Sequence, residues 1–167
     1  MLTGFQLRAS RSVLNLLIKD LASETGLYHT TLSRLENSTP NLSYLKCNLR
    51  SSILLIKFFE SKHVIFPNIN SICIKNIVGH VNHGRSITRF HLKISRIAMR
   101  ASQKIFGELF GIPQSTISDL ETTGMISDCI NVDEKLIKFF MSKGISFIDP
   151  WIIELFDDPD INLKILK

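Results

Sequence analysis

The sequence lacks the signatures of several large protein classes. No stretch approaches the ~20 consecutive apolar residues of a membrane-spanning helix, and the N-terminus lacks the basic-then-apolar order of a signal peptide. The chain contains no Walker loop, no glycine-rich dinucleotide loop and no Gly-x-Ser-x-Gly turn. These absences predict a soluble, cytoplasmic protein that is not an enzyme, binds no cofactor and does not associate with a membrane.

Cysteine is scarce, and the three residues present lie far apart: Cys47, Cys73 and Cys129. They form no Cys-x-x-Cys pair, so neither a zinc ribbon nor a disulfide framework is predicted, and a reducing cytoplasm suits them. His80, His83 and His91 come nearest to a metal-binding cluster. No cysteine or carboxylate completes a four-ligand set at a recognised spacing, so we interpret these residues as linker histidines and expect no metal.

Positive charge is in modest excess and unevenly distributed. The 167 residues carry a formal net charge of +5, with a pI near 9.2, which favours an acidic partner such as nucleic acid or an anionic membrane surface. Residues 1–80 carry nine Lys and Arg against four Asp and Glu, whereas residues 81–167 carry eleven of each. Because residues 85–104 are basic and residues 149–160 acidic, particular helices are expected to form a positive face.

An internal repeat is the most informative feature of the sequence. Residues 2–36 align without gaps on residues 87–121 with 11 of 35 positions identical, where ordinary composition gives roughly two or three by chance. After a four-residue slip, the similarity resumes between residues 55–66 and 136–147, where eight of 12 positions match. The chain is therefore predicted to contain two copies of one module.

Each copy is predicted to begin with three short helices. The first opens at Thr3 with Gln6 three residues later, which is the spacing of a capping box. The second runs over residues 18–25 and ends at Gly26, where a left-handed residue turns the chain without a Cβ clash. The third follows at once, over residues 28–37, and apolar side chains at helical spacing are expected to lock the second and third helices together.

Helices and short strands are predicted farther along each copy. The second copy repeats the three-helix pattern around Gly111, and longer amphipathic helices are predicted over residues 48–61 and 131–142. Residues 64–66 and 71–74 are compatible with a hairpin, and residues 145–147 with a matching strand. The predicted fold class is mainly α, with two tandem modules that each carry a short C-terminal strand or hairpin.

The predicted boundaries follow from the repeat and from composition. The segments are a first module over residues 1–74, a linker over 75–86, a second module over 87–156 and an acidic-to-basic tail over 157–167. Arg11 and Arg96 recur at equivalent positions. They are interpreted either as ion-pair partners of Glu36 and Glu121 or as phosphate contacts, and both interpretations stay open.

The segment Asp20-Leu-Ala-x-x-x-Gly-Leu-x-x-x-Thr-Leu-Ser-x-Leu-Glu36 resembles the lambda-repressor-like, Cro/XRE-type helix-turn-helix family. The segment Ser102-Gln-x-x-Phe-Gly-x-x-x-Gly-Ile-x-x-Ser-Thr-Ile-Ser-x-Leu-Glu121 resembles it equally. The later Leu-Ile-Lys-Phe-Phe repeat is similar to the helix-then-strand extension of many small bacterial members. The resemblance covers most of the chain and implies a DNA-binding transcription regulator of bacterial or phage type.

The resemblance implies base-reading roles for eight outward residues of the two recognition helices: His29, Thr30, Ser33, Arg34, Gln114, Ser115, Ser118 and Asp119. Arg34 is suited to grip guanine through two hydrogen bonds and Gln114 to do the same with adenine, because their donors and acceptors match those base edges. Asp119 can accept from cytosine but repels phosphate.

The resemblance also implies phosphate contacts from the start of each second helix and from the turn after the third, carried by Lys19, Asn37, Ser102, Gln103 and Lys104. One departure from the family pattern stands out. The polar entrance Ser102-Gln103 is replaced in the first copy by Leu17-Ile18, which removes a cap and a phosphate contact. Each copy is thus imperfect in a different place, which leaves open that one of them has exchanged DNA binding for a packing role.

The sequence therefore predicts a sequence-specific DNA-binding regulator, a repressor being the expected case, with double-stranded DNA as its partner. Its two reading helices would contact half-sites about one helical turn apart, roughly 34–36 Å. The alternative is an antitoxin-like or anti-repressor protein that uses both copies as a dimerisation scaffold. A homodimer, joined through the predicted strands or the long helices, and a separate protein partner both stay open.

Overall fold

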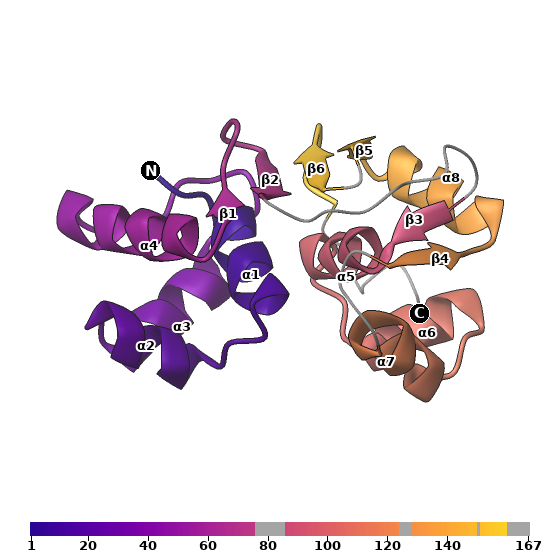
Figure 1. The fold of residues 1–167 in the computed structure, drawn as a ribbon, viewed down its shortest axis with the longest axis horizontal. Coiled ribbons are helices and arrows are strands. Elements are labelled where there is room, and N and C mark those ends of the chain that lie inside the picture. Colours follow the sequence, from indigo (N-terminus) through magenta and orange to yellow (C-terminus); the bar gives the residue numbers. More distant parts are fainter. Residues whose placement is uncertain (76–85, 124–127, 150, 160–167) are drawn as a thin grey trace.

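The computed structural model describes residues 1–75, 86–123, 128–149 and 151–159, and it is mainly α-helical with short antiparallel strands (Figure 1). The predicted mainly-α class is confirmed. Residues 76–85 of the predicted linker, with His80 and His83, and residues 160–167 of the tail lie outside the described residues.

The two halves of the chain contain corresponding elements in the same order. The elements of the first half are α1 (Gly4–Val13), α2 (Ile18–Thr25), α3 (His29–Ser38), α4 (Leu49–Ser61), β1 (Val64–Ile65) and β2 (Ser71–Ile74). Those of the second half are β3 (Ser86–Thr88), α5 (Arg89–Ala98), α6 (Gln103–Phe110), α7 (Gln114–Thr122), β4 (Cys129–Asn131), α8 (Glu134–Ser142), β5 (Ile145–Asp149) and β6 (Ile152–Leu155). The pair β3 and β4 corresponds in the first half to a single antiparallel bridge between Thr3 and Tyr44, the positions equivalent to Thr88 and Cys129.

The predicted capping box is present at the start of α1. The Thr3 amide donates to Gln6 Oε1 at 3.0 Å, and the Gln6 amide donates to Thr3 Oγ1 at 3.3 Å. The second half repeats this arrangement with an imidazole in place of the amide. The Thr88 amide donates to His91 Nδ1 at 3.4 Å, and the His91 amide donates to Thr88 Oγ1 at 3.2 Å.

Left-handed backbone conformations recur at equivalent positions of the two halves. Gly26 at φ 69° and Gly111 at φ 64° end α2 and α6, as predicted. The other left-handed residues also form equivalent pairs, which are Asn15 with Arg100 and His63 with Gly144. The repeat therefore extends to backbone turns where the residue types differ.

One four-stranded antiparallel sheet joins the two halves in the order β1-β2-β6-β5. The hairpin β1–β2 is present as predicted. At the centre of the sheet, Ile72 of β2 lies opposite Ile153 of β6. These residues are 81 positions apart, which is also the shift between residues 55–66 and 136–147 of the repeat. Ile72 and Ile153 are therefore equivalent positions of the two halves. A residue facing its own equivalent is the mark of a two-fold axis, here within a single chain.

Helix α1 packs against α5 and makes the second contact between the halves. Lys93 Nζ donates to Asn15 Oδ1 at 2.5 Å, and burial lowers the pKa of Lys93. Asn41 Nδ2 donates to the Ala98 carbonyl at 2.7 Å, and Arg100 donates to the Thr39 carbonyl at 2.5 Å. The hydrogen bonds across this contact thus run in both directions between the halves.

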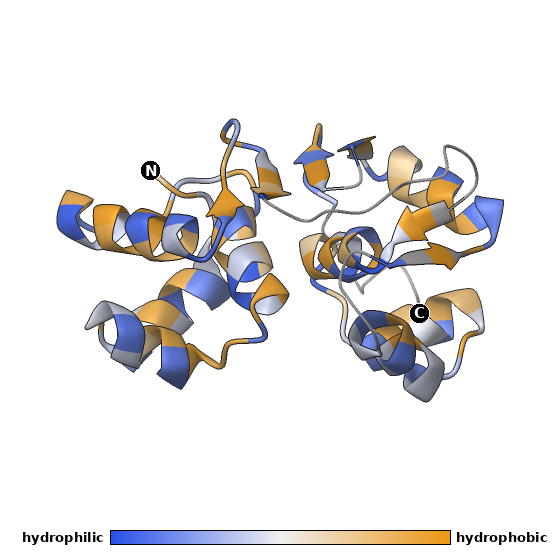
Figure 2. Ribbon diagram, in the orientation of Figure 1, coloured by the Kyte–Doolittle hydropathy of each residue, from blue (hydrophilic) through white to orange (hydrophobic). Residues whose placement is uncertain are grey.

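Apolar side chains from both halves form one core. Equivalent phenylalanines are fully buried in the two halves: Phe5 with Phe90, and Phe59 with Phe140. Hydrophobic and hydrophilic residues alternate around the helices (Figure 2), as expected for helices with one face in a core. Both α1 and the sheet contribute buried residues, so the halves share their interior.

The structure differs from the predicted elements, or adds to them, in three places. The helix predicted over residues 131–142 begins only at Glu134, because Asn131 pairs with Ser86 in β4 and Asp133 caps the helix. Of the strands predicted to join two chains, β2 is paired on both sides within the chain, whereas β1 and β5 are edge strands of the sheet. The acidic segment 149–160 contains β6, because its central Ile-Ile-Glu-Leu alternates between partly and fully buried side chains.

His91 is expected to make stability depend on pH. Burial lowers its pKa from 6.5 to about 4. Its Nε2 lies 2.9 Å from the Asp149 carbonyl, which fits a neutral ring that donates there and accepts the Thr88 amide at Nδ1. As pH falls from 6.5 towards 4, the His91 ring binds a proton in the unfolded chain but stays neutral in the folded chain. The unfolding free energy should therefore drop by about 3 kcal/mol over that range.

The matched variant is His91→Gln, because Gln6 fills the equivalent position with an uncharged side chain. Urea unfolding of both proteins at pH 7, 5.5 and 4.5, followed by Trp151 fluorescence, measures the difference. The variant should lose most of the decline below pH 6.5. An equal decline in both proteins would assign the pH dependence to other groups.

Candidate nucleic-acid interface

Each half presents two short helices joined by a tight turn. In the first half, Leu21 of α2 and Leu32 and Leu35 of α3 are almost fully buried and hold the two helices together. In the second half, Phe106 of α6 and Ile117 of α7 are fully buried and do the same. Since these apolar side chains use the inner faces, the outer faces of α3 and α7 remain available for polar contacts.

The predicted base-reading residues gather on these outer faces. On α3, His29, Thr30 and Arg34 are exposed and Ser33 is half-buried. The Arg34 side chain makes no ion pair with the described residues, so its guanidinium faces solvent. On α7, Gln114, Ser115 and Asp119 are exposed and Ser118 is half-buried.

The predicted phosphate contacts fall into two groups. Lys19 and Lys104 are exposed at the starts of α2 and α6, with Lys104 Nζ 4.0 Å from a Glu108 carboxylate oxygen. The other three side chains make hydrogen bonds within the protein. Asn37 donates to Ser33 Oγ at 3.3 Å, Ser102 Oγ caps α6 by accepting from the Ile105 amide, and Gln103 donates to Glu121 Oε2 at 3.0 Å.

The entrances to α2 and α6 differ as the sequence predicts. The Leu17 side chain makes no capping hydrogen bond, whereas the Ser102 side chain does. The structure adds a compensation, because Asp20 Oδ2 accepts the Leu17 amide at 2.9 Å. A carboxylate in the first turn stabilises the helix start but places negative charge where a phosphate would approach.

Arg11 and Arg96 form ion pairs with Glu36 and Glu121, which confirms one of the two interpretations left open. Arg96 Nε lies 2.5 Å from Glu121 Oε1, and a second bond joins Nη2 to Oε2 at 2.7 Å. Each arginine also donates to a backbone carbonyl five residues later in the chain. The pairs tie the last turns of α3 and α7 to the first helix of each half.

Sequence reasoning missed two further arginines that anchor the same helices. Arg8 donates to the Glu36 carbonyl at 2.6 Å, and Arg89 donates to the Leu120 carbonyl at 2.6 Å. Both satisfy carbonyl groups near the C-terminal ends of α3 and α7, which lack intrahelical partners. The signal in the sequence is only a basic residue on the first helix of each copy, and spacing does not reveal its target.

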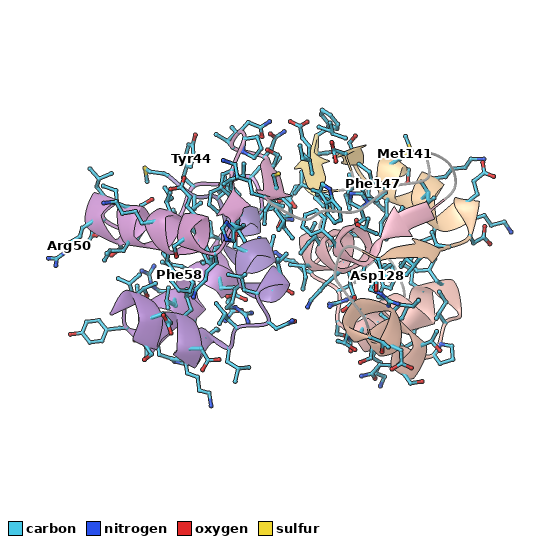
Figure 3. The ribbon with its side chains drawn as sticks, viewed as in Figure 1. Tyr44, Arg50, Phe58, Asp128, Met141 and Phe147 are labelled. Atoms are coloured by element: carbon cyan, nitrogen blue, oxygen red, sulfur yellow. The ribbon has the colours of Figure 1, made fainter. Side chains whose placement is uncertain are left out.

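The positive face predicted from residues 85–104 is wrong. Arg89, Lys93, Arg96 and Arg100 of this segment make hydrogen bonds or ion pairs inside the protein. Four exposed basic side chains lie on α4 and the segments beside it: Lys46, Arg50, Lys57 and Lys62. Arg50 points away from the outer end of α4 in Figure 3.

The two outer faces differ in charge. On α2 and α3, Lys19 and Arg34 balance Asp20 and Glu24 once Glu36 has paired with Arg11. On α6 and α7, Lys104 faces the two carboxylates of Glu108 and Asp119 once Glu121 has paired with Arg96. The first face is therefore electrically balanced and the second is weakly negative.

Both helix pairs lie on the same side of the molecule. In Figure 1, α2 and α3 occupy the lower left and α6 and α7 the lower right, with the joined sheet at the upper edge. The register of β2 on β6, with Ile72 opposite Ile153, fits a two-fold relation between the two pairs. One flank of the protein thus carries both sets of candidate reading residues.

A metal site and a membrane span are two further features to consider in the described parts of the chain. No group of three His, Cys, Asp or Glu side chains there is placed to hold a metal ion, and no helix is long and apolar enough to cross a bilayer. Comparisons of the chain with protein-family models, curated proteins and solved structures return no match, so its function is inferred from its own side chains.

Proposed function

We propose that the chain is a sequence-specific DNA-binding transcription regulator, a repressor in the expected case, and that α3 and α7 are recognition helices of two helix-turn-helix modules. The proposal rests on the exposed polar faces of α3 and α7, which lie on the same side of the molecule (Figure 1). The two halves that carry these helices are joined through the equivalent residues Ile72 and Ile153. A duplex has local two-fold symmetry, so two helices related in this way can enter successive major grooves about one turn apart, roughly 34–36 Å.

The two half-sites are expected to differ. Arg34 on α3 would read guanine in the first, while Gln114 would read adenine and Asp119 accept from cytosine in the second. The first outer face has no excess of negative charge, whereas the second carries an unbalanced carboxylate. Because like charges repel, the half-site contacted by α3 should contribute more of the affinity.

Selection of bound fragments from a random DNA pool, at low and moderate salt, tests the proposal. An asymmetric motif with two half-sites about a turn apart supports it. Absence of enrichment at both salt concentrations would contradict it.

Arg34→Ala is expected to lower affinity for the selected site by about 1–3 kcal/mol and to relax specificity at one base pair. The matched control is Arg50→Ala, another exposed arginine that lies on α4. The control should leave the base preference unchanged. Binding measured by fluorescence anisotropy on the site and on single-base variants separates the two, and equal profiles for both variants would remove Arg34 from the reading face.

A second candidate function is a protein-interaction module. Leu49, Ile53 and Leu54 on α4 are at least one-third exposed, and Tyr44 is also exposed. The equivalent face of α8 carries the Lys138–Glu134 ion pair. An apolar exposed face on α4 that the equivalent face of α8 lacks favours a protein partner at α4. Salt discriminates the two functions, because phosphate binding weakens steeply with salt and an apolar interface does not.

A further inference from the structure

The second half contains a cavity of about 600 Å³ between α6, α7 and the start of α8. Its wall is largely apolar and includes Leu109, Phe110, Ile112, Leu120, Val132 and Leu136. The polar side chains of the lining are Thr116, Asp133 and Lys135, all of them exposed, and the buried Leu92 and Ile117 complete it. Small-molecule sites typically enclose about 300–1,000 Å³ with apolar walls and few polar groups, so this cavity has the size and composition of such a site.

The cavity lies where the second half differs from the first in sequence and in helix length. Helix α8 begins at Glu134, which is equivalent to Ile53, so α8 lacks the first turn that α4 makes from Leu49. On α6, Leu109 and Phe110 replace the polar Glu24 and Thr25 of α2. The second half therefore combines larger apolar side chains with a shorter covering helix.

The equivalent leucines Leu35 and Leu120 differ in burial, which shows that the second half is packed less closely here. Leu35 at the end of α3 is fully buried, whereas the equivalent Leu120 on α7 is only partly buried. Apolar surface that lines an open cavity loses contacts that a close-packed core supplies. An apolar molecule in the cavity would restore those contacts to Leu120.

Charge at the cavity indicates the polar end of the occupant. Lys138 pairs with Glu134 at 2.9 Å, but Lys135 makes no ion pair with the described residues. The Asp133 carboxylate also lines the cavity, but it caps α8, where its Oδ1 accepts the Lys135 amide at 2.9 Å. The Lys135 ammonium is thus the cation available to an anion at the cavity, beside the N-terminal end of α8.

We propose that this cavity binds a small aromatic or acyl molecule with one anionic end. The apolar body lies among Phe110, Leu120 and Leu136, and the anion lies beside Lys135. Binding holds α7 against α6 and α8 and stabilises the second half. This site does not depend on DNA binding, although it adjoins the helix that carries Gln114.

Fluorescence titration with anilinonaphthalene sulfonate tests the site, because this probe joins an aromatic body to one anionic group. The wild-type protein should bind one equivalent saturably and show a higher thermal midpoint with the probe present. Thr116→Trp puts a large side chain at the cavity and should weaken binding at least about tenfold. The control is Thr31→Trp, the same change at the equivalent position of the first half, which should bind as the wild type does.

Lys135→Gln provides a second variant that leaves the apolar wall intact. It should weaken binding of the probe severalfold without changing the number of sites. Circular dichroism of each variant checks that the helices are retained. The proposal is overturned if the wild type shows no saturable binding, if Thr116→Trp and Thr31→Trp affect binding equally, or if Lys135→Gln leaves the affinity unchanged.

Discussion

Replacing Glu121 by alanine is expected to lower the unfolding free energy of the second half by about 3–5 kcal/mol. The Glu121 side chain is 1% exposed and that of Arg96 9%. Without the carboxylate, the Arg96 guanidinium stays buried with only the Ala101 carbonyl as a described partner, and Gln103 loses its acceptor. Urea unfolding followed by Trp151 fluorescence measures the loss.

Two controls separate burial from the ion pair itself. Glu36→Ala removes the equivalent carboxylate of the first half, where the Arg11 side chain is 23% exposed, so the loss there should be smaller because water can solvate the cation. The double variant Arg96→Met, Glu121→Leu removes both charges and should recover much of the stability, since no unpaired charge remains. A loss below about 1 kcal/mol for Glu121→Ala would contradict the structural role of the pair.

Replacing Ile153 by aspartate is expected to break the joined sheet. Ile153 and Ile72 are both fully buried and lie opposite each other at its centre. A carboxylate there has no described cation beside it, and burying an unpaired charge costs several kcal/mol. The variant should lose about 3 kcal/mol or more of unfolding free energy and show a larger radius in small-angle scattering, as the halves separate.

Ile148→Asp is the matched control, because Ile148 lies on β5 of the same sheet and is 57% exposed. It should change stability by less than about 0.5 kcal/mol and leave the radius unchanged. If Ile153→Asp kept the wild-type radius and stability, the α1–α5 contact alone would hold the halves together.

Local signals allowed much of each half to be predicted. The Thr3–Gln6 spacing predicted a capping box, and the glycines at positions 26 and 111 predicted the turns that end α2 and α6. The boundaries of α2 are as predicted, and those of α3 differ by one residue. These features depend on residues within a few positions of one another, so the sequence alone determines them.

Long-range pairing could not be predicted in the same way. Strands β3 and β4 are three residues long and join segments that are far apart in the chain. Strand β6 lies in the acidic segment 149–160, for which no strand is predicted. Short strands carry too little alternation to identify their partners, and the pairing of Ile72 with Ile153 depends on how both hairpins dock.

The candidate site was predicted unevenly for a related reason. Exposed residues such as Arg34 and Gln114 follow from helical periodicity and lie on the expected faces. The roles of basic residues do not follow from periodicity. Arg89 and Arg100 reach carbonyl groups 31 and 61 positions away, so a basic stretch in the sequence does not become a basic surface.

The central pairing of Ile72 with Ile153 joins two halves of one polypeptide. This affects how the protein behaves at low concentration and how the sequences of its halves can change. Two halves linked in one polypeptide keep a fixed effective concentration, so the frame does not come apart at low protein levels as a two-chain assembly does. A substitution also alters one half alone, whereas in a homodimer it appears twice. The differences between Arg34 and Asp119, and between α4 and α8, are changes that the identical chains of a homodimer could not accumulate.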